Sequence, residues 1–171
     1  MFLAKVGKLT SQYINIVNLV MFQGVWWLSI LYQNAAFGFS LGLLLFHFML
    51  SSRMQSDVIL MLKVVLLGIA VDSLLTYGGI FHFSETPYWL ILLWCHFAIS
   101  LGYSLAFTQK LPWYINALLG GVFGCLSYLA GARFDAVHLP LEYLTSAMIL
   151  FAIWIVIFPM FVYVSRRTLK D

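Results

Sequence analysis

Asp72 offers this chain's clearest chemistry, because it stands in residues 58–79, a stretch otherwise apolar enough to cross a bilayer. A carboxylate inside a membrane is costly, and it marks a proton relay, a ligand site or an ion pair. At about 1.5 Å per helical residue, further polar side chains fall at a similar depth, in the outer half of the membrane. The candidate binding site consists of these residues: Asp72, His96, Ser100, Tyr128, Arg133 and Glu142.

The carboxylate of Asp72 and the imidazole of His96 could exchange a proton with a bound molecule. No nucleophile motif accompanies them, so the sequence names no catalytic residue and leaves open whether the protein is an enzyme. The alternative is structural: His96 would then hydrogen-bond a neighbouring helix and do no chemistry.

Arg133 is the basic residue expected to meet the charge of Asp72. It follows the predicted span 113–131, and a long side chain there can bend inward. We therefore expect it to pair with Asp72 first, and with Glu142 or Asp135 second. Such a pair could belong to a site, or it could fix helix packing alone, since intramembrane charges serve both roles.

A second polar set is expected toward the opposite side of the membrane. Its members are Asn18, Gln23, His47 and Asn116. We expect them to form hydrogen bonds between helices. Small residues also recur at helical spacing in span 113–131, including Gly120 and Gly124, which predicts close approach of a neighbouring helix.

The composition requires lipid as the solvent. Of 171 residues, 63% are hydrophobic and 9% charged, whereas soluble domains carry about 25% charged residues. We expect an all-α integral membrane bundle, a single domain over residues 1–171. Residues 1–12, with apolar positions on one helical face, are expected to lie in the interface. Six transmembrane helices are predicted: residues 14–33, 35–50, 58–79, 88–107, 113–131 and 142–164.

The basic residues predict the orientation. With both termini in the cytoplasm, all nine Lys and Arg residues except Arg133 fall on the cytoplasmic side, as the positive-inside rule requires. An even number of spans agrees with this arrangement.

Common cofactor and metal motifs are missing from the sequence. There is no H-x-x-x-H, H-E-x-x-H, C-x-x-C, P-loop or G-x-S-x-G, so we expect no metal site and no cofactor. Cys95 and Cys125 give no disulfide framework. No basic patch with interleaved aromatics predicts nucleic-acid binding.

Four stretches carry a family resemblance: residues 18–27 (NLVMFQGVWW), 66–75 (LLGIAVDSLL), 87–104 (PYWLILLWCHFAISLGYS) and 124–140 (GCLSYLAGARFDAVHLP). On these stretches the chain resembles domain-of-unknown-function family 2878; it departs at Cys125, where the family pattern has proline. The resemblance implies an uncharacterised, multi-pass bacterial inner-membrane protein. It also implies an association with lipid-modifying enzymes, whose genes often lie nearby, but it supplies no reaction.

Three functions remain open. The protein could handle a membrane lipid or other hydrophobic small molecule at the polar site, as an enzyme or an accessory factor. It could be the substrate-binding membrane subunit of a transporter, with a membrane-protein partner. It could also be a structural or assembly factor without a ligand. The sequence names neither the ligand nor the oligomeric state.

Overall fold

The computed structural model describes residues 2–84 and 87–169, with side chains described from Tyr13 onward. Its elements, in chain order, are α1 (Phe2–Tyr32), η1 (Gln33–Ala36), α2 (Phe37–Leu50), α3 (Met54–Tyr77), α4 (Tyr88–Ser100), η2 (Ala106–Lys110), α5 (Trp113–Leu119), η3 (Gly120–Gly124), α6 (Cys125–Arg133) and α7 (Tyr143–Thr168). The described part is all-α, as predicted; its single β-type feature is an isolated bridge between His82 and His138.

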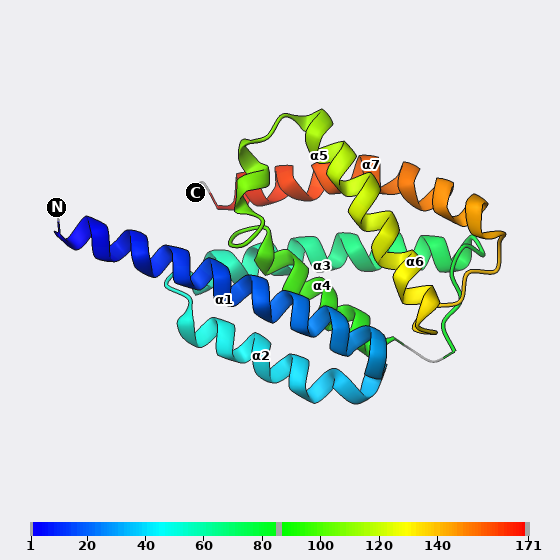
Figure 1. The fold of residues 1–171 in the computed structure, drawn as a ribbon, viewed down its shortest axis with the longest axis horizontal. Helices are drawn as coiled ribbons and strands as arrows, with labels where there is room; N and C mark the ends of the chain where they lie inside the picture. Colours follow the sequence, from blue (N-terminus) through cyan, green and yellow to red (C-terminus); the bar gives the residue numbers. More distant parts are fainter. Residues whose placement is uncertain (1, 85–86, 170–171) are drawn as a thin grey trace.

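The helices form a bundle with α3 and α4 in its middle (Figure 1). α1 and α2 form an antiparallel hairpin that turns at η1 and packs on α4. α5, η3 and α6 make one continuous helical rod that crosses α7, and η3 is its π-helical centre. α1 begins and α7 ends at the same end of the bundle, called here the terminal end. The opposite end, called the loop end, holds the α3–α4 and α6–α7 connections.

Four stretches of the described chain are long and apolar enough to cross a membrane, so the prediction of six is wrong by this measure. They are Tyr13–Leu50, Met54–Tyr77, Trp113–Arg133 and Tyr143–Thr168. Two predicted spans, 14–33 and 35–50, fall in the first stretch, joined through η1. α4 is apolar but has 13 residues, about 20 Å of helix, because the chain leaves helical geometry after Ser100.

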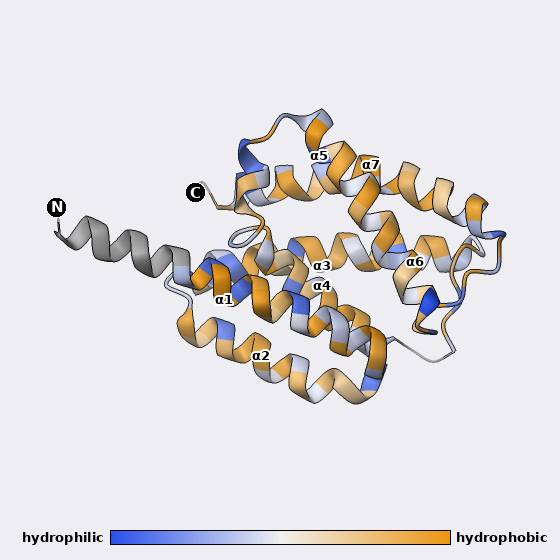
Figure 2. Ribbon diagram, in the orientation of Figure 1, coloured by the Kyte–Doolittle hydropathy of each residue, from blue (hydrophilic) through white to orange (hydrophobic). Residues whose placement is uncertain are grey.

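The surface agrees with a lipid environment. Hydrophobic residues run along most helices, and many of the hydrophilic ones lie near helix ends and in the connections (Figure 2). Large apolar side chains such as Leu66, Leu74 and Val156 are exposed to 69%, 70% and 67%. In water an apolar surface this extensive would drive association, whereas lipid tails solvate it.

The first residues described belong to α1, which runs without interruption from Phe2 to Tyr32. The expectation that residues 1–12 lie in the membrane interface depends on which face their side chains present. Those side chains lie outside the described residues, so the interfacial segment stays a prediction.

Two glycines allow the tryptophans of the interior to pack closely. A Cβ atom at Gly68 would overlap the indole ring of Trp94, and one at Gly124 would overlap the indole of Trp154. Glycine is therefore required at both positions for steric reasons, which confirms the close helix approach predicted for span 113–131. The two indoles belong to the core that joins α3, α4 and α7.

Candidate functional site

Asp72 lies in the interior and is held by two neutral donors. Its side chain comes from α3 and the residue is 5% exposed. The indole N–H of Trp94 (α4) donates to Asp72 Oδ2 at 2.6 Å, and the hydroxyl of Tyr128 (α6) donates to Oδ1 at 2.5 Å. One carboxylate thus ties three helices together, and each of its oxygens has a partner.

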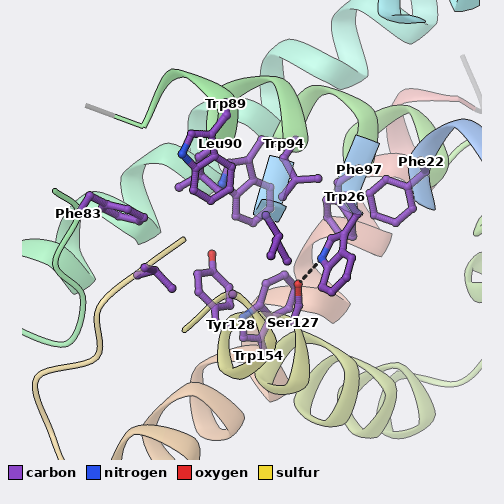
Figure 3. Close-up of a pocket in the computed structure, with 14 residues that line it drawn as sticks. Phe22, Trp26, Phe83, Trp89, Leu90, Trp94, Phe97, Ser127, Tyr128 and Trp154 are labelled. Carbon is purple, nitrogen blue, oxygen red and sulfur yellow. Dashed lines mark hydrogen bonds between the residues drawn. The ribbon is translucent and has the colours of Figure 1, made fainter. Parts of the chain in front are cut away.

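An aromatic cavity lies beside this triad. Trp94 and Tyr128 both line it, and its volume is about 80 Å³. Figure 3 shows side chains from α1, α4, α6 and α7 converging on this space. Its aromatic lining residues are Phe22, Trp26, Phe83, Trp89, Trp94, Phe97, Tyr128 and Trp154. The cavity is therefore an apolar chamber with a few polar atoms, the usual composition of a ligand site.

A groove of about 550 Å³ adjoins the cavity, between α1 and the rod of α5, η3 and α6. Cavity and groove share lining residues, including Phe22, Phe97 and Trp154. The indole N–H of Trp26 on α1 donates to Ser127 Oγ on α6 at 2.8 Å, and this bond links the two sides of the groove (Figure 3). Several groove residues are exposed apolar side chains of the bundle surface, among them Trp27, Phe107, Phe123 and Leu126. The groove therefore opens toward the surface that lipid would cover.

A cleft of about 900 Å³ lies against Asp72 on another side. Asp72 and Thr76 of α3 contribute to its wall, together with His82 and Ser84 of the loop end. The backbones of His82 and His138 hold the two connections together there, with N–H···O distances of 2.9 and 2.8 Å. Asp72 thus stands between the aromatic cavity and a cleft at the loop end.

The structure brings together two of the six predicted site residues, Asp72 and Tyr128. His96 bonds instead through Nε2 to the backbone oxygen of Ser40 on α2, at 3.0 Å. The hydroxyl of Ser100 donates to the backbone oxygen of Phe97 in its own helix at 2.7 Å. These two residues lie on a different face of α4 from Trp94, and no described contact joins them to Asp72.

The expected ion pair of Arg133 is absent from the described residues. Arg133 is exposed at the end of α6 and lines a second cleft at the loop end, together with Asp135 and His138. Glu142 is exposed as well, at the start of α7. The prediction is wrong because the side chain of Arg133 lies in the exposed surface at the end of α6, while Asp72 accepts hydrogen bonds from Trp94 and Tyr128.

The second polar set is spread over the bundle. Asn18 Oδ1 accepts from the hydroxyl of Ser104 at 2.7 Å, which links α1 to the turn after α4. Asn116 donates to the backbone oxygen of Thr108 at 3.0 Å. Gln23 is exposed and lines the groove, and His47 belongs to a cluster that the sequence analysis missed.

That cluster surrounds Asp57, which is 1% exposed. Its Oδ2 accepts from the hydroxyls of Ser51 at 2.6 Å and Tyr103 at 2.7 Å. His47 Nε2 lies 3.5 Å from the same oxygen, and Arg53 Nε lies 3.3 Å from Oδ1. Asp57 therefore has cationic or ionisable partners, unlike Asp72. The signal that could have revealed it is the Arg53–Asp57 spacing of four residues at a helix start.

The site also contains tryptophans that the sequence-based prediction does not include. On α4, Leu90, Trp94 and Phe97 recur at helical spacing and line the cavity. Trp94 lies within the apolar predicted span 88–107, and a buried indole N–H needs an acceptor. That need, together with a carboxylate in the neighbouring span 58–79, is the signal in the sequence that points to this bond.

Residues 15–160 match the family described as "Protein of unknown function (DUF2878)". The chain belongs to this family. The DUF2878 match includes Asp72, Trp94 and Tyr128, and every residue that lines the aromatic cavity. Comparison with curated proteins and with solved structures finds no match. The family thus supports the sequence-based resemblance, and the function rests on the geometry described above.

Proposed function

We propose that this DUF2878 protein binds a lipid or another hydrophobic small molecule, with an apolar chain in the groove and one end in the aromatic cavity. The observation that carries the proposal is the continuity of cavity and groove. A molecule dissolved in the bilayer would reach Tyr128 by passing between α1 and the rod of α5, η3 and α6, without crossing water.

The side chains along this path suit such a molecule. The groove is mostly apolar, which favours burial of a hydrocarbon chain. Ser127 and Tyr128 place hydroxyl groups on the cavity wall, where they can bond a polar end group. Trp26 and Ser127 line both the groove and the cavity and are joined by a hydrogen bond. Breaking this bond to widen the boundary between the two spaces would cost about 0.5–1.5 kcal/mol.

The proposed location is the bacterial inner membrane, with the terminal end in the cytoplasm. Four basic residues support this orientation, since they lie in or beside elements of the terminal end: Arg53, Lys110, Arg166 and Arg167. Arg133 is the last residue of α6 and lines a cleft of the loop end together with His82 and His138. This asymmetry is the one that the positive-inside rule describes.

A second candidate is the substrate-binding subunit of a transporter. The cleft that reaches Asp72 from the loop end favours it, because a ligand could then approach Asp72 from the loop end as well as from the lipid side. Co-purification with an energy-coupling membrane partner would select this candidate.

Native mass spectrometry of the protein, extracted gently from its own membrane, tests the proposed function. We expect a bound species of lipid-like mass that is retained on the wild-type chain. Gly131→Leu is the blocking variant, because Gly131 lines the cavity, and it should lose this species. Gly24→Leu is the matched control, since no atom lies within 4 Å of a Cβ there. Retention by all three proteins would contradict the proposal.

A further inference from the structure

We infer that the aromatic cavity recognises a cation: a quaternary or protonated amine at the end of a hydrophobic chain. This inference deepens the proposed function and rests on it, because it names the chemical class of the end group that the cavity would hold. It is carried by two observations, the aromatic lining of the cavity and the carboxylate behind it.

The first observation is the arrangement of the rings. Trp94 and Trp154 are nearly parallel, with centroids 6.1 Å apart and planes 8° apart. The ring centroids of Tyr128 and Trp154 are 6.1 Å apart, and those of Phe97 and Trp94 are 5.5 Å apart. These rings line the same cavity. The face of an aromatic ring attracts a cation, and a cage of several rings is the recurrent way to bind quaternary ammonium groups.

The second observation is the charge of Asp72. Its two donors, Trp94 and Tyr128, are both wall residues of the cavity, so the carboxylate lies directly behind two of the walls. Within the described part of the chain, no Lys, Arg or His pairs with it. A buried carboxylate without a counter-ion is costly, and a cation in the cavity would reduce that cost.

Asp57 shows that the absence of a cation at Asp72 is specific to this site. Asp57 is the other buried aspartate among the described residues. His47 lies within 3.5 Å of it and Arg53 within 3.3 Å. Arg133, the basic residue at the end of α6, has an exposed side chain and forms no described contact with Asp72. The complementary charge at Asp72 is therefore left to a molecule from outside.

The size of the cavity agrees with a compact head group. Its volume of about 80 Å³ is roughly five to eight times what one water molecule needs. This suits an ammonium group with a few attached carbons. The adjoining groove then receives the chain, so the ligand would be a single-chain or long-chain amine rather than a small hydrophilic cation.

The test compares two probes of the same shape. Dodecyltrimethylammonium carries the charge, and 2,2-dimethyltetradecane replaces its nitrogen by carbon. Each is titrated at low mole fraction into the full-length protein in nonionic maltoside micelles. The melting temperature and the tryptophan emission are followed. Because Gly131→Leu blocks the cavity, binding that persists in this variant is assigned to sites outside the cavity. We expect the cation to bind at least about tenfold more tightly than the neutral isostere.

The outcomes separate this inference from the proposed function. Equal binding of both probes, abolished by Gly131→Leu, would overturn the cation inference and keep the proposed function. Binding of neither probe, or binding unaffected by Gly131→Leu, would overturn both. Tighter binding of the neutral probe would also overturn the inference.

Two variants test which side chains cause the preference for the cationic probe over the neutral one. Asp72→Asn removes the charge behind the rings, and it should bring the two probes to within about threefold of each other. Trp154→Leu removes one ring and should weaken the cation more than the isostere. Trp113→Leu is the matched control, because Trp113 is 72% exposed and does not line the cavity. An unchanged preference in both Asp72→Asn and Trp154→Leu would overturn the inference.

Discussion

The hydroxyl of Tyr128 donates a hydrogen bond of 2.5 Å to the Asp72 side chain, and this bond joins α6 to α3 in the interior of the bundle. The same carboxylate accepts from Trp94 on α4. Asp72 is therefore both a structural link between three helices and the carboxyl group behind the aromatic cavity. The predictions below separate these two roles.

Asp72→Asn should lower the free energy of unfolding by about 1–3 kcal/mol. The amide keeps the size of the carboxylate but offers one acceptor, so either Trp94 or Tyr128 loses its partner, and a buried unpaired donor costs about that much. Tyr128→Phe removes the donor on the other side and should cost a similar amount. Denaturation in detergent measures both, and the double variant should cost less than the sum, because the two residues interact directly.

Arg133→Gln should change the free energy of unfolding by no more than about 0.5 kcal/mol, as usual for an exposed position. Combined with Asp72→Asn, its effect should simply add, since distant sites are independent. Stability recovered in this double variant would mean that the two residues pair after all. The same denaturation measurement decides it.

Gly124→Ala should destabilise the protein by about 1–3 kcal/mol, the usual cost of overpacking. Its Cβ would overlap the indole of Trp154, with no open space on that side. Gly24→Ala is the control: it also lies in a helix, but nothing stands near its Cβ, so it should be neutral or slightly stabilising. Equal melting temperatures for the two variants would show that the Trp154 contact is not tight.

Asp57→Asn should cost about 3 kcal/mol, the lower end of the range for breaking a buried ion pair, because the side chain of its partner Arg53 is 37% exposed. The loss should be larger than that of Asp72→Asn, since Asp57 meets Arg53 and His47 while Asp72 meets neutral donors. Thermal melting of both variants in the same detergent checks the order. The reverse order would contradict the assignment of charged partners.

Part of this architecture follows from the sequence. The apolar composition predicts a membrane bundle, and depth counting along two spans brings Asp72 and Tyr128 together. The glycine spacing predicts the close approach at Gly124. These features depend on helical periodicity and rise, which are nearly constant from one protein to another.

The rest depends on helix rotation and on exact helix ends. His96 has a suitable depth, but it lies on a face of α4 that turns toward Ser40. Depth alone cannot show this, because a shift of two residues rotates a side chain to another face. Asp57 was missed because the predicted span began one residue later, which left a buried carboxylate in a supposed loop.

The central claim is that a hydrophobic molecule enters between α1 and the rod of α5, η3 and α6 and ends in the aromatic cavity. Photo-crosslinking in native membranes tests it most directly, with a long-chain amine that carries a diazirine beside its nitrogen and an alkyne for isolation. Peptide mapping should find adducts on cavity and groove residues, chiefly Trp26, Phe97 and Ser127. They should disappear in Gly131→Leu and persist in Gly24→Leu. Adducts spread over the outer surface, at residues such as Leu66 and Val156, with none in the cavity or groove, would contradict the claim.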